Sequence, residues 1–593
     1  MQPLEAYRQR LVERRALADH ARRQFGLIAN ARLAVFGIGL LLGILAFGFN
    51  LLSPWWLCLP GLTFVALLIL HDQAGRRRER AERAASFYER GVERLEERWI
   101  GKGVTGERYQ DANHPYAADL DILGAGSLYE RLCTARTPTG QETLARWLLG
   151  PAEPDVVRAR QQAVLELRPL LDLREDLAVL GPDMDTRLSP TALTSWANEP
   201  IQLQMLWPRL VLEILSALAV ASLIGWFGLE TGYLPLLAVA SAEGLFALAF
   251  RRRVTRVIAG IDRAVQDLEL LAELLERIES LPLNSARLRS LQSELLADGI
   301  LPSRRIAHLV NLLHWLDARR NQFFLPIALL TLWTTRLAFA IDRWRAHSGP
   351  AVARWLAIVG EFEALLALAG YSFENPEDIF PEILDQGPKF EAQSLGHPLL
   401  PRATCIRNDI QLGEPLRALI VSGSNMSGKS TMLRTVGINA VLALAGGPVR
   451  ASQLRLSLLS IGATLRIQDS LQAGKSRFYA EITRVRQLVE LAEGPRPLLF
   501  LLDEIFAGTN SHDRCIGAQA IIRGLVERGA IGLATTHDLA LADIADSLSP
   551  RAANVHFADH LENGELRFDY RMRPGVVTHS NALALMRAVG LEV

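Results

Sequence analysis

The chain has 593 residues, which is enough for several domains. Hydrophobic residues make up 49% of it and charged residues 22%, and the formal net charge is zero, so no global basic field draws the chain to nucleic acid. Any DNA contact would need a local basic patch. The four cysteines form no CxxC pair, which argues against a zinc site or a disulfide framework and indicates an intracellular C-terminal half.

The N-terminal region predicts a membrane hairpin. Residues 1–32 are charged and helix-prone, without the pattern of a secretory signal. Apolar runs follow at 33–52 and 55–70, and the first is uncharged and long enough to cross a bilayer. Trp55 and Trp56 lie at the turn, where an aromatic belt is expected. Arginines flank the two outer ends and none lies in the turn, so both ends are predicted to be cytoplasmic.

A second pair of apolar runs repeats this pattern at 210–229 and 233–250, closed by three arginines. Glu213 and Glu243 lie within these runs. A charged group at the centre of a membrane is costly, so each carboxylate is expected to face a partner helix or to lie near the interface. The alternative for this pair is two buried helices of a soluble domain.

The remaining segments complete the predicted layout. A third apolar run, 323–341, contains Pro326 and Arg336 and is interpreted as a buried core helix rather than a span. Proline and glycine cluster at 375–388, which indicates a linker or a domain boundary, and after Gly396 apolar strands alternate with helices as in an α/β domain. The predicted segments are a charged helix (1–32), a transmembrane hairpin (33–70), a cytoplasmic helical connector (71–118), a helical core (119–209), a second hairpin (210–250), the rest of the helical core with a lever (251–388) and the α/β domain (389–593).

The strongest motif occupies residues 423–431 and matches GxxxxGK[ST]. Its members are Gly423, Ser424, Asn425, Met426, Ser427, Gly428, Lys429, Ser430 and Thr431. A predicted strand at 416–422 precedes it and a helical stretch follows, so backbone N–H groups and the helix N-terminus would face phosphate oxygens. Lys429 is predicted to bind the β- and γ-phosphates and Ser430 to ligate Mg²⁺. A nucleoside triphosphate and Mg²⁺ are therefore the expected ligands.

Two later segments supply the rest of a nucleotide site. The apolar run 497–502 ends in Asp503 and Glu504. Asp503 is predicted to hold Mg²⁺, mostly through water, and Glu504 to polarise the attacking water; the alternative is an ordinary strand end with two solvated acids. The segment 531–538 is a predicted strand that ends in a polar loop, where His537 could sense the γ-phosphate or orient water. A lone histidine in such a place is usually structural.

These segments resemble the MutS family of DNA mismatch-repair ATPases. GSNMSGKST is similar to the family's phosphate loop, LLDEIFAGTN to its Walker B segment and ATTHD to its histidine switch. Residues 474–481 resemble a Ser-Thr-Phe-x-x-Glu segment whose serine reaches the γ-phosphate of a dimer partner; Ser476 matches that serine, while Arg477 replaces the threonine. The resemblance implies an ABC-like α/β P-loop NTPase domain, an all-α core and lever domain, and ATP hydrolysis in a composite site of a homodimer.

The resemblance also predicts how the base of the nucleotide is bound. The family usually stacks adenine on an aromatic residue just before an Asn-Asp pair, which corresponds here to Asn408-Asp409. Cys405 occupies the place of that aromatic residue, and Tyr570, by a looser match, is expected to stack on the adenine instead. Ser424 and Ser427 also replace the proline and glycine that are commoner in the loop.

The resemblance covers residues 119–197 and 253–593 and is dense only after Gly396. It implies DNA binding and a role similar to mismatch repair, although the family's N-terminal mismatch-recognition domain, with its Phe-x-Glu wedge, is expected to be missing. Three hypotheses remain open. The first is a dimeric MutS-like ATPase in a bacterial inner membrane, multi-pass, with its ATPase domain in the cytoplasm. The second is an ABC-like ATPase coupled to membrane transport, against which the sequence shows no Leu-Ser-Gly-Gly-Gln signature. The third is a nucleotide-switched membrane scaffold that does not bind DNA.

Overall fold

The computed structural model describes residues 2–180, 190–203, 206–229, 231–259, 265–296, 299–318, 324–424, 426–466, 477–506, 511–537, 542–562 and 565–577. The chain divides into two compact units. Unit 1 comprises residues 1–134, 143–179 and 364–593, and unit 2 comprises residues 135–142 and 180–363. This division differs from the predicted domains, because part of the helical core groups with the N-terminal hairpin and the α/β domain.

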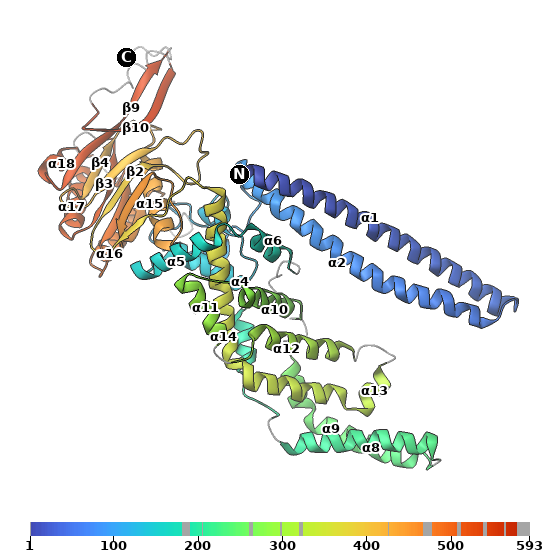
Figure 1. Ribbon diagram of the computed structural model, residues 1–593. Helices are drawn as coiled ribbons and strands as arrows, with labels where there is room; N and C mark the ends of the chain where they lie inside the picture. Colours follow the sequence, from blue (N-terminus) through green and yellow to red (C-terminus); the bar gives the residue numbers. More distant parts are fainter. Residues whose placement is uncertain are drawn as a thin grey trace. The chain divides into compact units, whose positions relative to one another are not determined.

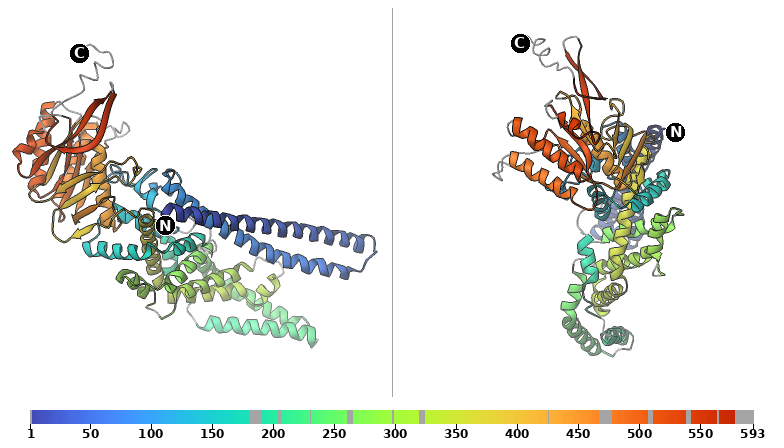
Figure 2. Two further views of the ribbon diagram at one scale, coloured as in Figure 1. Left: turned by 45° about the horizontal axis from the view of Figure 1, so that its top comes forward. Right: turned by 90° about the vertical axis from the view of Figure 1, so that its left-hand side faces the viewer.

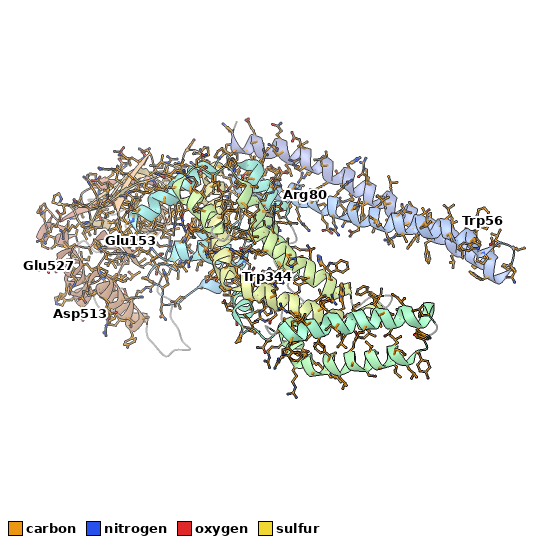
Figure 3. The ribbon with its side chains drawn as sticks, turned by 60° about the horizontal axis from the view of Figure 1, so that its bottom comes forward. Trp56, Arg80, Glu153, Trp344, Asp513 and Glu527 are labelled. Carbon is orange, nitrogen blue, oxygen red and sulfur yellow. The ribbon has the colours of Figure 1, made fainter. Side chains whose placement is uncertain are left out.

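Unit 1 begins with a long helical hairpin. Helices α1 (Pro3–Gly43) and α2 (Cys58–Leu95) lie side by side and are joined by a π-helical turn (Ile44–Gly48) and a 3-10 turn (Pro54–Leu57) (Figures 1 and 2). Trp56 lies at the tip of this hairpin and Arg80 lies further along α2 (Figure 3). The charged segment 1–32 and the first apolar run thus form one helix, and not two separate elements. The predicted connector is helical only as far as Leu95, apart from a short 3-10 turn (Glu107–Tyr109).

The α/β part of unit 1 is built on a six-stranded sheet of order β10-β9-β4-β8-β7-β6. All neighbours are parallel except β9 and β10, which form an antiparallel ribbon. Its strands are β4 (Ala418–Ser422), β6 (Ser460–Thr464), β7 (Leu498–Asp503), β8 (Ile531–Thr536), β9 (Ala552–Glu562) and β10 (Glu565–Pro574). The sequences of β4, β7 and β8 are nearly continuous apolar runs, as expected of parallel strands buried on both faces.

A second sheet of four strands has the order β1-β5-β2-β3. Its strands are β1 (Glu382–Leu384), β2 (Phe390–Leu395), β3 (Asn408–Leu412) and β5 (Gln453–Ser457). Because β1 pairs with β5, the sheet begins before the predicted boundary at residue 389. The segment 375–388, predicted to be a linker or a domain boundary, contains β1, and its Asp378 is buried and pairs with Arg402 at 2.6 Å.

Further helices complete unit 1, several of which contact the sheets. They are α3 (Leu128–Leu132), α5 (Pro154–Leu167), α6 (Leu171–Val179), α15 (Lys429–Ala445), α16 (Arg477–Ala492), α17 (Ser511–Glu527) and α18 (Asp543–Ser547), while α4 (Pro138–Leu149) crosses the unit boundary in the sequence. The first segment of the core contacts the α/β part directly. Asp119, which is buried, accepts hydrogen bonds from the backbone of Leu465 and Arg466 and pairs with Arg484 at 2.9 Å.

Unit 2 is helical in its described residues. Its elements are α7 (Pro190–Asn198), α8 (Leu206–Gly228), α9 (Leu234–Ile258), α10 (Val265–Ser280), α11 (Ala286–Leu296), α12 (Pro302–Asp317), α13 (Leu325–Leu330) and most of α14 (Trp333–Glu374). The run 323–341 is not the single helix that was predicted. It is divided between α13 and α14 at Leu332, which has φ of 45°. The α14 part is buried as predicted, whereas Ile327 and Leu329 on α13 are exposed.

Within the part of the chain that the structure describes, four helices are long and apolar enough to cross a membrane, judged by length and composition alone: Pro3–Gly48, Pro54–Leu95, Trp207–Gly228 and Leu234–Ile258. They overlap the four apolar runs of the two predicted hairpins, and the first two extend well beyond them. Large apolar side chains on them are exposed, among them Leu33, Phe36, Leu62, Ile214 and Leu245. An exposed apolar surface of this kind marks a membrane or protein contact in other proteins.

Candidate functional site: a phosphate loop and a carboxylate at one sheet edge

The phosphate loop connects β4 to α15 in unit 1. Its two glycines adopt backbone conformations that L-residues rarely adopt, with φ of 149° at Gly423 and 104° at Gly428. A Cβ atom at Gly423 would lie 3.0 Å from the carbonyl oxygen of Phe557, and one at Gly428 would lie 3.1 Å from Cδ1 of Tyr570. Both positions therefore require glycine for conformation and for space. Gly428 is also the N-cap of α15, which directs the amide end of that helix toward the loop.

Lys429 is buried in this loop. Its Nζ donates to the carbonyl oxygens of Gly423 at 2.8 Å and Ser424 at 3.0 Å, and lies 3.4 Å from Oε1 of Glu504. The side chain is only 4% exposed. A buried ammonium group needs anionic or carbonyl partners, and the loop supplies them from its own backbone and from the end of β7. The loop thus holds one positive charge where a phosphate-binding motif requires it.

The two acidic residues at the end of β7 are arranged by a residue of β8. The Thr535 hydroxyl donates to Oδ1 of Asp503 at 2.5 Å and accepts from the backbone N–H of Glu504 at 3.0 Å. Because β8 lies between β4 and β7, its last residues face both the loop and the acids. Thr535 was not among the residues predicted from the sequence. Its place at the end of a predicted strand, beside the strand that ends in the two acids, could have indicated a role in positioning them.

Glu504 lies between two groups that can be cationic. Its Oε1 faces Lys429, and its Oε2 lies 3.3 Å from Nδ1 of His537, which directly follows β8. Glu504 has φ of 46° and Phe506 has φ of 62°, both in the left-handed region. Non-glycine residues in this region are uncommon and cluster at functional sites, where the surrounding structure holds them in place. Asp503 and Glu504 are therefore not ordinary solvated acids at a strand end.

Two loop hydroxyls lack partners within the described residues. The Oγ atoms of Ser424 and Ser427 are buried and make no hydrogen bond there. A buried hydroxyl without a partner costs about 1–3 kcal/mol, and phosphate oxygens would satisfy both. Ser430 follows Lys429 in the first turn of α15, so its hydroxyl and the carboxylate of Asp503 supply oxygen donors of the type that Mg²⁺ prefers. The residues present fit an ATP–Mg²⁺ complex.

Tyr570 lies against the phosphate loop, although it is remote in sequence. It occurs at a register shift of β10, with φ of 53°, and its ring is the nearest group to Gly428. Asn408 fixes this irregularity from β3: its Nδ2 donates to the carbonyl oxygen of Tyr570 at 3.0 Å, and its Oδ1 accepts from the N–H of Met572 at 2.8 Å. The residue is 45% exposed, so part of it is accessible to a ligand. Cys405 instead contacts the backbone of His397.

The segment that resembles the family's trans-acting element lies only partly in the described residues. Ser476 lies outside them, as does Asn425 of the phosphate loop. Glu481, on α16, is buried and accepts a hydrogen bond from the backbone N–H of Phe506. The rings of Phe478 and Phe506 meet edge to face at 6.2 Å. The start of α16 is therefore joined to the loop that follows Glu504. Met426 and Thr431, the remaining loop residues, are exposed.

The strand–loop–helix unit, the neighbouring acidic strand end and the strand between them define a P-loop nucleotide-binding domain. Residues 419–592 match the family model described as MutS domain V. This region of the chain therefore belongs to the MutS family.

Similar proteins lead to the same family. The chain is 33% identical over 213 residues to a protein of Thermus thermophilus named Endonuclease MutS2, and 34% identical over 282 residues to a protein of Thermomicrobium roseum with the same name. It is 31% identical over 247 residues to a DNA mismatch repair protein MutS of Roseiflexus. These matches cover 35%, 44% and 40% of the chain, but only 27%, 33% and 22% of the relatives. The chain thus spans about a quarter to a third of the length of the curated relatives that it matches.

Proposed function

We propose that the protein is a membrane-anchored ATPase of the MutS type that works as a homodimer and acts on DNA. The observation that carries the ATPase part is the position of the Glu504 carboxylate, between Lys429 of the phosphate loop and His537 after β8. A carboxylate held between a phosphate-binding lysine and a histidine can orient a water molecule for attack on a γ-phosphate.

Each residue has a defined task in the proposed reaction. Lys429 would exchange its loop carbonyl partners for the β- and γ-phosphates, and Ser430 and Asp503 would hold Mg²⁺, which neutralises the charge that develops on the phosphates. Glu504 would orient and polarise a water molecule, whose oxygen would bond to the γ-phosphorus while the bond from that phosphorus to the oxygen bridging to the β-phosphate breaks. The proton that the water loses would pass to Glu504 and then to solvent, and ADP and inorganic phosphate would leave. His537 would hold the second oxygen of Glu504 in place. Tyr570 would stack on the adenine, since its exposed ring lies beside Gly428.

The membrane part of the proposal rests on the two exposed apolar hairpins. The α8 and α9 helices have 23 and 25 residues, about 35 Å at 1.5 Å per residue, which matches the hydrocarbon core of a bilayer. Arginines flank the outer ends of the first hairpin but not its turn, so both ends and the ATPase domain would lie in the cytoplasm. We propose a multi-pass protein of a bacterial inner membrane.

DNA and dimerisation enter the proposal through the relatives and the resemblance. One of the similar proteins is named for DNA mismatch repair and two for endonuclease activity. By that likeness, Ser476 of one subunit would complete the partner's ATP site, and the nucleotide cycle would move the helical core and lever. DNA is the ligand that this likeness favours for the helical core and lever.

The ATPase assignment can be tested on the purified full-length protein. Glu504→Gln should keep ATP affinity and lower the hydrolysis rate by about 10²–10⁴-fold, the usual contribution of a group that assists proton transfer. Lys429→Ala should abolish nucleotide binding. The matched control is Glu490→Gln, which changes an exposed carboxylate on α16 and should leave the rate unaltered. Undiminished turnover in Glu504→Gln would remove that residue from the mechanism.

The DNA assignment needs a separate measurement. ATPase rates should be compared with no DNA, duplex DNA, mismatched DNA and branched DNA, at low and physiological salt. Stimulation that weakens as salt rises is the expected result, because phosphate contacts release counterions. A rate indifferent to all DNA would contradict the DNA part and favour a nucleotide-switched membrane scaffold.

A further inference from the structure

Unit 2 contains a cavity of about 500 Å³ beside the first turns of α8. Its wall is formed by α8, α12 and α14. The basic side chains that line it are Arg209, Arg305, His308, Arg336, Arg343 and His347. Among the described lining residues, Glu213 is the one carboxylate. Four arginines against one carboxylate make the cavity strongly cationic, which is the charge pattern of a site for an anion.

Two of these arginines have unsatisfied donors. The Nε atoms of Arg209 and Arg336 are buried and have no hydrogen-bond partner within the described residues. Arg336 contacts Glu213 through one nitrogen of its guanidinium group, since Nη2 lies 3.0 Å from Oε2 of that carboxylate. The guanidinium of Arg209 lies 5.6 Å from the centre of the Phe339 ring. A guanidinium group presents its donors in a fixed fork that matches phosphate oxygens. A phosphate in the cavity would supply acceptors for arginine donors that have no partner within the described residues.

The cavity also has apolar lining residues, and an exposed apolar surface of α8 begins beside it. Leu212 and Phe339 line it together with the arginines. Starting one residue after Arg209, the side chains of Leu210, Ile214 and Leu218 are exposed by 64%, 57% and 48%. Their spacing of four residues places them along one side of α8. A cationic cavity next to an exposed apolar stripe fits a molecule with an anionic head and an apolar tail, whereas duplex DNA offers no apolar chain for such a stripe.

We infer that this cavity binds the phosphate of an anionic phospholipid headgroup whose acyl chains lie along α8. The inference rests on the proposed insertion of the α8–α9 hairpin into a membrane. The bound phosphate would bridge Arg209 on α8, Arg305 on α12 and Arg336 on α14, and so connect the membrane hairpin with the two helices beneath it. The lipid would serve as a structural ligand that sets the position of the hairpin relative to α14 within unit 2.

The test uses the full-length protein in nanodiscs that contain phosphatidylcholine and phosphatidylglycerol in equal parts. After release from the discs, native mass spectrometry reports the phospholipid that remains bound. The wild type should retain phosphatidylglycerol in preference to phosphatidylcholine. Arg209→Gln combined with Arg336→Gln should reduce that retention by about tenfold or more, since bonds to charged groups are lost. The matched control combines Arg251→Gln with Arg252→Gln, which removes two exposed arginines at the end of α9 and should retain the lipid.

Further arms separate the outcomes. Retention should survive an excess of inorganic phosphate or of duplex DNA; displacement by either at low concentration would overturn the lipid assignment in favour of a soluble phosphate or a nucleic acid. Equal lipid retention in the wild type and the double variant would also overturn it. The single variant Arg209→Gln, which leaves the Arg336–Glu213 pair in place, serves if the double variant does not fold, and unchanged hydrogen exchange of the helices of unit 2 reports folding.

Failure of the membrane proposal is visible independently. Leu229 is exposed beside the α8–α9 turn. In a variant whose native cysteines are replaced, Leu229→Cys should react with a membrane-impermeant maleimide only from the outer side. Labelling from the cytoplasmic side would contradict insertion of this hairpin, and with it the lipid site. Outer labelling without lipid retention would contradict the lipid site alone.

Discussion

The two apolar hairpins differ in length and in how much of their apolar surface the protein itself covers. Helices α1 and α2 have 41 and 38 residues, and 6% and 0% of their most apolar windows are buried. Helices α8 and α9 have 23 and 25 residues, and 22% and 17% of the corresponding windows are buried. The first hairpin therefore carries a long charged extension beyond an apolar part that the protein leaves almost entirely uncovered, whereas the helices of the second are about as long as a single span and pack in part within unit 2.

The hairpins also differ in their attachment. At the base of the first, Arg94 pairs with Glu374 at 2.6 Å with side chains only 15% and 2% exposed, and the Tyr7 hydroxyl donates to the same carboxylate at 3.4 Å. Burial is the main cause that raises the pKa of Tyr7, so this hydroxyl stays protonated. At the base of the second, the Arg336–Glu213 pair is 35% and 62% exposed. The first attachment depends on buried charges and the second on a solvated pair.

Glu374 links the first hairpin to the rest of unit 1. Glu374 is the last residue of α14, and the next elements along the chain belong to the sheets. Phe373, its neighbour, stacks on Tyr7 at 5.5 Å. The hairpin therefore contacts the chain directly before the α/β part begins, and motion of the end of α14 would be felt at the base of the hairpin.

The largest expected effect comes from breaking the buried pair. Glu374→Gln leaves the Arg94 guanidinium buried without its counter-charge, and such a loss costs about 3–5 kcal/mol. Thermal unfolding of unit 1 in detergent can be monitored through the loss of nucleotide binding. The variant should unfold at a much lower midpoint temperature than the wild type. Arg8→Gln, which breaks the exposed Arg8–Glu96 pair on the same hairpin, is the control and should leave the midpoint unchanged. Equal midpoints for both variants would show that burial does not distinguish the two pairs.

An intermediate effect is expected from acid, with opposite signs in the units that carry the two hairpins. In unit 1, burial and then the charges of Arg450 and Arg434 lower the pKa of His397 from 6.5 to about 4. Its Nδ1 accepts from the N–H of Leu399, which fits the neutral ring. The unfolded chain takes up this proton near pH 6.5 and the folded unit does not. Stability is therefore complete above about pH 6.5 and falls by up to about 3 kcal/mol as the pH decreases to 4.

Unit 2 should respond in the other direction because burial raises the pKa of Glu363, against the hydrogen bonds that it accepts from Thr137 and Arg136. The folded unit holds this proton more tightly than the unfolded chain, so unit 2 loses stability as the pH rises through the raised pKa. Hydrogen exchange resolved by unit between pH 7 and 5 should show unit 1 weakening and unit 2 gaining. His397→Gln should remove most of the slope in unit 1. Parallel behaviour of both units would contradict the assignment.

The smallest effect is expected at the base of the second hairpin. Glu213→Gln breaks the solvated pair with Arg336. In detergent it should lower the free energy of unfolding of unit 2 by about 1 kcal/mol or less. The same variant removes the one carboxylate among the described lining residues of the cationic cavity, so retention of an anionic lipid should increase. A large loss of stability would show that this attachment is as dependent on charge as the first.

The sequence by itself determined the elements whose signal is local. The phosphate loop, the acidic strand end and the four apolar helices are each encoded within about ten to forty consecutive residues, because backbone conformation and burial period follow from neighbouring side chains. The strands at 416–422, 497–502 and 531–538 were predicted to within two residues of β4, β7 and β8. Tyr570 was proposed for the nucleotide site only through a family likeness, and its ring does lie beside the loop.

Only the tertiary structure decided the contacts between residues that are remote in sequence. Asn408 holds Tyr570 across 162 positions, Arg94 meets Glu374 across 280, and Thr535 reaches Asp503 from the adjacent strand. No spacing rule specifies such pairs, because they depend on which strands are neighbours and on where a helix ends. The cationic cavity in unit 2 is of the same kind, since its arginines come from three helices and acquire a common function only where those helices pack.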